Sequence, residues 1–373
     1  MSKDLMFPSL SVRAHQGFNA MFLCPFFEGY RDPYFLDCTL SGRKDIAVQE
    51  LSLIRRFIEK YHPPCLTIYV KHNLRPEVLT LLQHRTLRTL RLCSPLGFRP
   101  GYRKHPKQHM GIGLWDHVVN FNASSPCLFT PVGKRFLCAI ACGQSIQELH
   151  LSNHSMSPLA WAALLPQIIA PKLRVFEVDG RVSLKCLGAF LVNHIDIHTL
   201  KIGNICIPTR LGKAITLPAL TDLHAPVSAA LPLLRGSRNI NTLELLMDAF
   251  AHPKHFREAL RCLSELPVVD LSLDFTAELV GILNEPNVPG YLQSITNISL
   301  YLNSVAFSDS MLTAVHDCFV GSPALTILNI AEFFKTPGEP HPILLKCGRF
   351  SNDVIIQIEH TWSENGNGFR SHC

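Results

Sequence analysis

Short apolar segments recur along the chain with a constant internal spacing. The stretch Leu173–Val178 (LRVFEV) reads apolar-x-x-apolar-x-apolar, and Ile197–Ile202 (IHTLKI) repeats that order 24 residues later. A pattern that recurs roughly every 20 to 30 residues is typical of chains whose stacked units bury their apolar sides against one another. The pattern therefore predicts a protein built from many similar short units.

The same pattern can be followed along almost the whole chain. Its copies begin 20 to 30 residues apart, except for one gap of 59 residues between Leu87 and Ile146. A degenerate copy, Asp116-x-x-Val119-x-Phe121, divides this gap into 29 and 30 residues. We therefore expect 12 or 13 repeats. The first positions of the other copies are Phe7, Phe35, Pro63, Leu87, Ile146, Leu173, Ile197, Leu220, Ile240, Val268, Ile295 and Leu325.

Each copy predicts a short strand followed by a helix. The last two apolar residues of a copy are two apart, so they point to the same side of a strand. The segments between copies have apolar residues at helical spacing, and several follow Ser, Asp or Pro, as helix starts do. We predict helices at 46–61, 76–83, 134–142, 158–169, 183–193, 255–266 and 308–320.

A unit of strand, turn, helix and return is a leucine-rich repeat. The predicted fold is therefore an α/β horseshoe-shaped solenoid, with a parallel β-sheet on its concave face and irregular helices on its convex face. The repeats are expected to occupy residues 1–345, with a basic loop inserted near residues 94–115 and an irregular crossing at 331–342. Residues 346–373 are expected to form a C-terminal cap strand at 354–358 and a polar tail.

Three phrases resemble the leucine-rich-repeat region of mushroom-type fungal F-box proteins. They are Leu217–Leu223 (LPALTDL), Phe190–His194 (FLVNH) and Leu233–Leu245 (LLRGSRNINTLEL). The resemblance implies the substrate-recognition region of a ubiquitin-ligase adaptor. An F-box is missing ahead of the repeats, so a cullin–RING adaptor role would require that module to be restored upstream. Among the well-formed copies only Asn303 stands where standard repeats carry an asparagine, so we expect irregularly held turns.

Composition favours a folded chain in a reducing compartment. Apolar residues make up 47% and charged residues 17%, which is ample for a core. The thirteen cysteines are an odd number and stand singly, and no signal peptide is visible at the start, so cytoplasmic or nuclear localisation is expected. The most apolar stretch, 158–171, is shorter than the roughly 20 residues that cross a membrane.

The sequence contains few signs of a metal-binding, catalytic or nucleic-acid-binding site. The spacing Cys138-x3-Cys142-x7-His150-x3-His154 resembles a zinc finger, but its central gap is short, and we interpret these residues as core cysteines and solvated histidines. No catalytic or phosphate-binding motif is present, so we expect neither enzymatic activity nor a cofactor. The net charge of +6 is only weak support for binding to nucleic acid. A nucleic-acid-associated protein that uses the basic loop 99–109 remains the alternative.

Polar residues flanking the apolar pairs suggest a binding surface. In each strand they point away from the buried pair, which places them on the exposed concave face. From Glu148 to Asp274 these positions hold seven acids and one lysine. One-sign surfaces steer oppositely charged partners, so we expect a protein partner with a basic segment. The candidate partner-binding residues are Glu148, His150, Glu177, Asp179, Asp222, His224, Glu244, Asp270 and Asp274.

Overall fold

A computed structural model describes a large part of the chain. The described residues are 10–13, 35–40, 52, 55–56, 58–60, 62, 64–70, 85–93, 115–203, 213–246, 252–275, 277–283, 285–302, 324–334 and 355–362. Residues 94–114 of the predicted basic loop, with the alternative site at 99–109, lie outside them. So do the predicted helices at 76–83 and 308–320 and the polar tail from residue 363.

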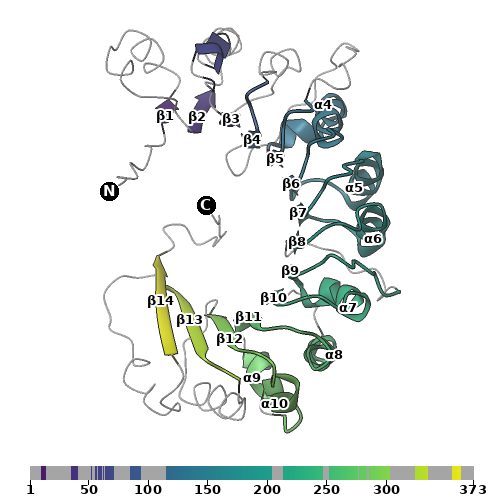
Figure 1. The fold of residues 1–373 in the computed structure, drawn as a ribbon, viewed down its shortest axis with the longest axis vertical. Coiled ribbons are helices and arrows are strands. Elements are labelled where there is room, and N and C mark those ends of the chain that lie inside the picture. The colour runs from purple at the N-terminus through teal and green to yellow at the C-terminus, as the bar shows by residue number, and fades with distance from the viewer. Residues whose placement is uncertain are drawn as a thin grey trace, which may run out of the picture. The chain divides into compact units, whose positions relative to one another are not determined.

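Parallel strands form the framework of both compact units of the chain, Met1–Ile197 and His198–Cys373. In each unit every described strand pairs with its neighbours along the chain, from β1 to β7 and from β8 to β14 (Figure 1). The predicted α/β class with a parallel sheet is confirmed. The strands of the first unit are β1 (Leu10–Arg13), β2 (Phe35–Leu40), β3 (Cys65–Val70), β4 (Thr89–Cys93), β5 (Asn120–Ala123), β6 (Glu148–Asn153) and β7 (Val175–Gly180). Those of the second are β8 (Thr199–Ile202), β9 (Asp222–Pro226), β10 (Thr242–Leu246), β11 (Asp270–Phe275), β12 (Asn297–Leu302), β13 (Ile327–Phe334) and β14 (Ile355–Trp362).

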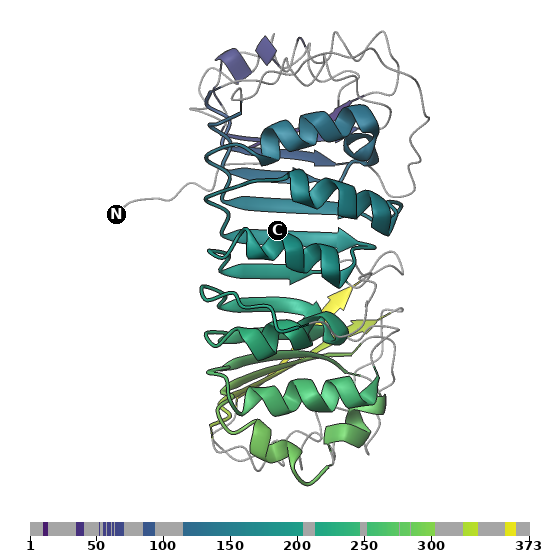
Figure 2. The same ribbon diagram turned by 90° about the vertical axis from the view of Figure 1, so that its right-hand side faces the viewer.

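Helices connect the strands and lie along one side of them within each unit (Figures 1 and 2). No described helix is both long enough and apolar enough to cross a membrane. The first unit contains the 3-10 helix η2 (Pro126–Phe129), α4 (Pro131–Ala141), α5 (Pro158–Leu164), η3 (Leu165–Gln167) and α6 (Leu184–Val192). The second contains α7 (Val227–Gly236), α8 (Pro253–Leu263), α9 (Ala277–Leu283) and α10 (Val288–Tyr291).

Local sequence explains where most of these helices lie. Thr130, Ser157 and Ser183 accept a hydrogen bond at the starts of α4, α5 and α6, as capping residues do. Helix α8 buries residues at spacings of three and four, which is the mark of one apolar helical face. The predictions at 134–142, 158–169, 183–193 and 255–266 are confirmed to within a few residues. Helices α7, α9 and α10 were not predicted, and α7 contains Pro232 and starts without a side-chain cap.

The apolar pairs of successive copies form a buried row in each unit. Paired strands place the equivalent residues opposite one another, as with Leu149 and Phe176, or Leu243 and Leu271. None of the eight residues that represent these rows is more than 2% exposed. They are Leu149, Leu151, Phe176 and Val178 in the first unit, and Leu200, Ile202, Leu271 and Leu273 in the second.

Two predicted copies have the wrong register. Leu36, rather than Cys38, pairs with Leu66, so the copy predicted to begin at Phe35 begins two residues earlier. Phe121 pairs with both Leu90 and Leu149, so the degenerate copy begins two residues after Asp116. Its first position is therefore residue 118, a fully buried valine. The irregular crossing predicted from residue 331 is also wrong up to residue 334, because β13 continues that far.

Asn153 holds the turn after β6 one position before the place where standard repeats carry an asparagine. Its side chain is 7% exposed, and its Oδ1 accepts hydrogen bonds from the Ser155 backbone N–H at 3.0 Å and hydroxyl at 2.8 Å. The next strand places Gly180 opposite Asn153, with a φ of 153°. A Cβ there would lie 2.7 Å from the Asn153 carbonyl oxygen and 3.0 Å from the Trp161 ring. The turn is therefore held by an asparagine on one strand and a glycine on the next.

A buried histidine joins two successive repeats in the core of the first unit. The His194 ring is 5% exposed and stacks on Phe190, whose ring lies 4.4 Å from that of Phe176. Its Nε2 accepts a hydrogen bond from the Ala170 N–H at 3.2 Å, so Nδ1 carries the proton and donates to the Phe190 carbonyl at 2.8 Å. Burial lowers the pKa of His194, although its hydrogen bond to Phe190 opposes the shift. The neutral ring is therefore the form that fits the core.

Acidification should destabilise the first unit through this ring. Because its pKa is lowered on folding, the unfolded chain binds the proton more readily, and stability is lost as the pH falls below the ordinary value of about 6.5. His194→Gln keeps one donor and one acceptor but cannot titrate. We expect the wild type to lose about 1 kcal/mol more unfolding free energy than this variant between pH 7.5 and 5.5. Denaturant titrations at both pH values measure the difference. An equal loss in both proteins would contradict the assignment, and His198→Gln, at an exposed position, is the control.

Candidate functional site

The candidate site is the side of the strands that faces away from the buried rows, which we call the polar strand face. Alternate residues of a strand point to opposite sides, so the positions that flank a buried pair lie on this face. All nine predicted partner-binding residues occupy such positions and are partly exposed. The first unit carries Glu148, His150, Glu177 and Asp179 on β6 and β7; the second carries Asp222, His224, Glu244, Asp270 and Asp274 on β9 to β11.

In the first unit the acids of this face are bound to polar residues of the neighbouring strands. The Asn120 amide on β5 donates a hydrogen bond to Glu148. His150 Nδ1 lies 2.8 Å from Glu177 Oε2, and the two residues are direct cross-strand partners. Beyond the end of β6, His154 Nε2 lies 3.3 Å from an oxygen of Asp179. The four predicted site residues of this unit therefore take part in three separate polar pairs.

Asp179 is more enclosed than Glu177, the other acid on β7. Its side chain is 16% exposed, compared with 40% for Glu177. Burial raises the pKa of Asp179; the nearby His154 lowers it and the negative charge of Glu177 raises it further. The carboxylate form of Asp179 is therefore less favoured than in water, and His154 partly compensates for this cost.

The second unit repeats the arrangement on different strands. His224 Nδ1 lies 2.6 Å from Glu244 Oε2, again as direct cross-strand partners. Asp270 accepts a hydrogen bond from the side-chain amide of Asn297 on β12. Lys201 is the residue of β8 opposite His224. Each unit thus combines a histidine–glutamate pair with an amide–carboxylate pair.

Sequence reasoning missed these pairs because it counted charges without aligning neighbouring copies. The signal was present, since His150 and Glu177 stand at the same place of successive copies, as do His224 and Glu244. Residues at the same place of adjacent parallel strands become side-by-side neighbours. Aligning the copies would therefore have shown a histidine beside a glutamate twice.

The four residues of the zinc-finger-like spacing have other partners in the structure. Cys138 lies on α4 and Cys142 is the C-cap residue of that helix. Cys142 Sγ is 3.2 Å from the Gln167 carbonyl oxygen, while His150 and His154 pair with carboxylates from β7. Burial and the neighbouring Cys142 raise the pKa of Cys138 to about 11, against the effect of Lys134. Among the described residues no three His, Cys, Asp or Glu side chains are grouped to hold a metal ion.

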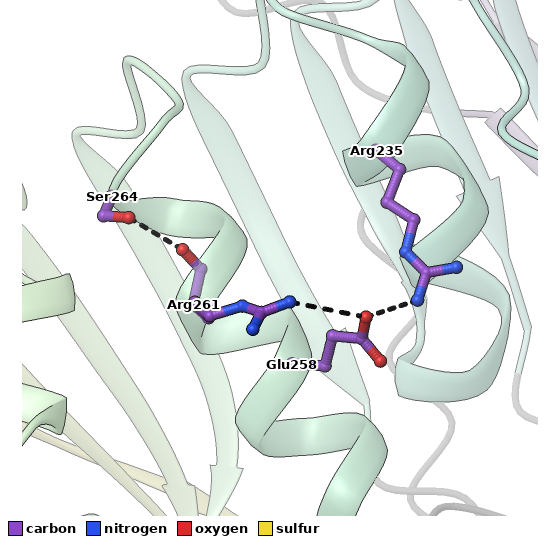
Figure 3. A network of polar contacts seen from close by, with 4 residues as sticks. All are labelled: Arg235, Glu258, Arg261 and Ser264. Atoms are coloured by element: carbon purple, nitrogen blue, oxygen red, sulfur yellow. Dashed lines mark hydrogen bonds and ion pairs between the residues drawn. The ribbon is translucent and has the colours of Figure 1, made fainter.

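On the helix side of the second unit, acids pair with arginines. Glu258 on α8 forms ion pairs with Arg235 of α7 and with Arg261 one turn further along α8, whose carbonyl accepts from Ser264 (Figure 3). The hydrogen bond from Arg235 is the main cause that lowers the pKa of Glu258; burial opposes it, and the charges of Arg235, Arg261 and His255 lower it further. Two more pairs, Arg257–Glu285 and Arg238–Glu265, join segments of neighbouring repeats.

The acidic residues on the two sides of the second unit therefore have different kinds of partner. Glu258, Glu265 and Glu285 are matched by permanently charged guanidinium groups, whereas Glu244 and Asp270 have a histidine and an amide as partners. Unlike a guanidinium group, neither an imidazole nor an amide carries a permanent positive charge. A comparison of the chain with models of known protein families and with curated protein sequences found no match.

Proposed function

We propose that the protein is a non-enzymatic scaffold that recognises another protein through its polar strand face. We further propose that its repeats are leucine-rich repeats, like those in the substrate-recognition region of an F-box ubiquitin-ligase adaptor. Sequential parallel strands, helices along one side and buried rows of Leu, Ile, Val and Phe support this interpretation. The proposal concerns recognition of the partner alone.

The unequal pairing of acids is the observation that carries the proposal. A carboxylate that pairs with arginine contributes little to the electrostatic potential outside the protein. The two opposite charges lie so close together that their potentials largely cancel at a distance. Carboxylates beside neutral histidine and amide groups keep their charge. Asp222, Glu244, Asp270 and Asp274 therefore outnumber Lys201 at the polar strand face of the second unit. Such a one-sign surface attracts and orients a cationic partner.

The expected partner is a protein segment rich in lysine and arginine. Neighbouring strands lie about 4.8 Å apart, so the four strands β9 to β12 extend over about 15 Å. An extended peptide advances about 3.3 Å per residue, so about five residues would cover that distance. A short basic segment that crosses the strands would thus meet acids from several repeats.

Neutralising the acids of the polar strand face should weaken binding of a basic peptide. The test variant is Asp222→Asn, Glu244→Gln and Asp270→Asn combined, which preserves hydrogen-bonding groups and adds three positive units of net charge. For a capped nonapeptide of lysine and arginine, we expect the dissociation constant to rise on the order of tenfold, because several weak charge contacts are lost together. Fluorescence anisotropy of the labelled peptide at low ionic strength measures it.

The matched control changes the net charge by the same amount on the helix side. It combines Glu258→Gln, Glu265→Gln and Glu285→Gln, and we expect a change of less than about twofold because those acids are already paired with arginines. Circular dichroism verifies that both variants are folded. Equal weakening by the two variants would show that the peptide responds to total charge, and the polar strand face would lose its assigned role.

A further inference from the structure

Both units place a histidine beside a glutamate at the same position of the polar strand face. His150 pairs with Glu177 on the next strand, at 2.8 Å between Nδ1 and Oε2, and His224 pairs with Glu244 at 2.6 Å between the same atoms. In each case the two residues occupy the register position between the two buried apolar residues of their strands. The geometry of one pair thus recurs in a second pair, 74 residues further along the chain.

The groups around His150 are mainly neutral or acidic. The strand before it, β5, places Asn122 directly opposite and carries Asn120 two residues earlier. Its own strand carries Glu148, and beyond that strand His154 faces Asp179. The following strand contributes Glu177. A proton on His150 would therefore be surrounded by carboxylates and amides.

Among the residues that the structure describes on the adjacent strands, the neighbours of His224 include one cation. Lys201 of β8 stands opposite it on one side and Glu244 of β10 on the other. Asp222 lies two residues earlier on its own strand, and Thr242 is opposite Asp222. A proton on His224 would therefore add a positive charge between Lys201 and Glu244.

We propose that, within each unit by itself, one histidine (His150 or His224) makes the binding of a cationic protein segment by the polar strand face of that unit depend on pH, an inference that rests on the proposed function above. When the rings are neutral, Glu177 and Glu244 present their negative charge to the partner. When each ring takes a proton from solvent, it forms a full ion pair with its glutamate, and the outward charge is cancelled. Histidine gains its proton between about pH 7.5 and 5.5, where most carboxylates remain ionised. The partner is bound at neutral pH and released as the pH falls.

The test compares peptide binding at two pH values and constant ionic strength. The probe is the capped lysine–arginine nonapeptide, which has no group that titrates in this range. For the wild type we expect the dissociation constant to rise on the order of tenfold from pH 7.5 to 5.5. For the variant with His150→Asn and His224→Asn, the dissociation constant should change by less than about twofold between the two pH values. Asparagine can still donate to the glutamate but cannot take up a proton.

A second histidine pair provides the control. His252→Asn and His255→Asn change the start of α8 on the helix side, where His252 caps the helix and asparagine is a good substitute. This control should keep the full pH response of the wild type. A variant with glutamine at positions 150 and 224 repeats the measurement if the asparagine variant is unfolded, and circular dichroism at both pH values verifies folding.

The outcomes separate this inference from the proposed function. Binding that is equally strong at both pH values, or a response that survives in the asparagine and glutamine variants, overturns the role of the histidines and leaves the proposed function standing. Absence of peptide binding at both pH values overturns the cationic partner and this inference with it. Loss of the response in the control variant as well would place the titrating group elsewhere and also overturn the inference.

Discussion

Leu200→Ala should lower the free energy of unfolding by about 2–5 kcal/mol, because it empties a packed position that the surrounding residues cannot close. Leu200 lies on β8 of the second unit, is fully buried, and stands opposite Leu223 of the next strand. Both residues belong to the buried row. A denaturant titration followed by circular dichroism measures the loss.

The adjacent residue supplies a matched control for this substitution. Lys201 points to the polar strand face and is partly exposed, so Lys201→Ala should change stability by no more than about 0.5 kcal/mol. Two neighbouring residues of one strand should therefore differ several-fold in their effect. Similar losses at both positions would mean that the two faces of the strand have been assigned incorrectly.

Gly133→Ala should destabilise the first unit by about 3 kcal/mol, although alanine is normally the better helix former. Gly133 is in the first turn of α4, where its N–H donates to the capping Thr130 side chain at 3.2 Å. A Cβ at this position would lie 2.7 Å from the Leu128 Cα and closer still to the Cys127 carbonyl oxygen. Both of these are backbone atoms of η2, so the clash cannot be relieved by turning a side chain.

A second helical glycine separates this clash from helix propensity. Around Gly281 in α9, nothing lies within 4 Å of the place a Cβ would take. Gly281→Ala should therefore stabilise the protein by about 0.5–1 kcal/mol. Thermal unfolding of both variants tests the contrast. If Gly133→Ala were also stabilising, α4 and η2 would not be packed as closely as the structure shows.

Most of the strand register could be predicted from the sequence, and the two errors have a common physical cause. Side chains along a strand alternate with a period of two, so a shift of two residues keeps the same kind of residue on each face. The predicted copies at Phe35 and Asp116 were displaced by that amount, and their inside–outside pattern remained plausible. The burial of residue 118 and the pairing of Phe121 with Leu149 decide between the two registers. Contacts between copies carry that information, and a single copy does not.

The candidate site could be predicted in position but not in its interactions. Alternation alone placed Glu177 and Glu244 on the face that turns away from the core. Their partners were not visible, because a pair such as His150 and Glu177 joins residues 27 apart in the sequence. The helix-side pair of Arg235 and Glu258 likewise spans 23 residues. Such distances equal about one repeat, so the partners emerge only when successive copies are superimposed.

The parallel pairing of each strand with its sequence neighbours determines how local destabilisation is transmitted within a unit. In the run β9 to β12, for example, β10 pairs with β9 and β11 and with no other strand that the structure describes. Each repeat is then coupled directly only to its nearest neighbours. Unfolding of one repeat weakens the adjacent repeat directly and more distant repeats only through it. Substitutions at the polar strand positions of one repeat can consequently accumulate while the other repeats keep their geometry. The binding specificity of such a surface can therefore change through substitutions on one strand at a time.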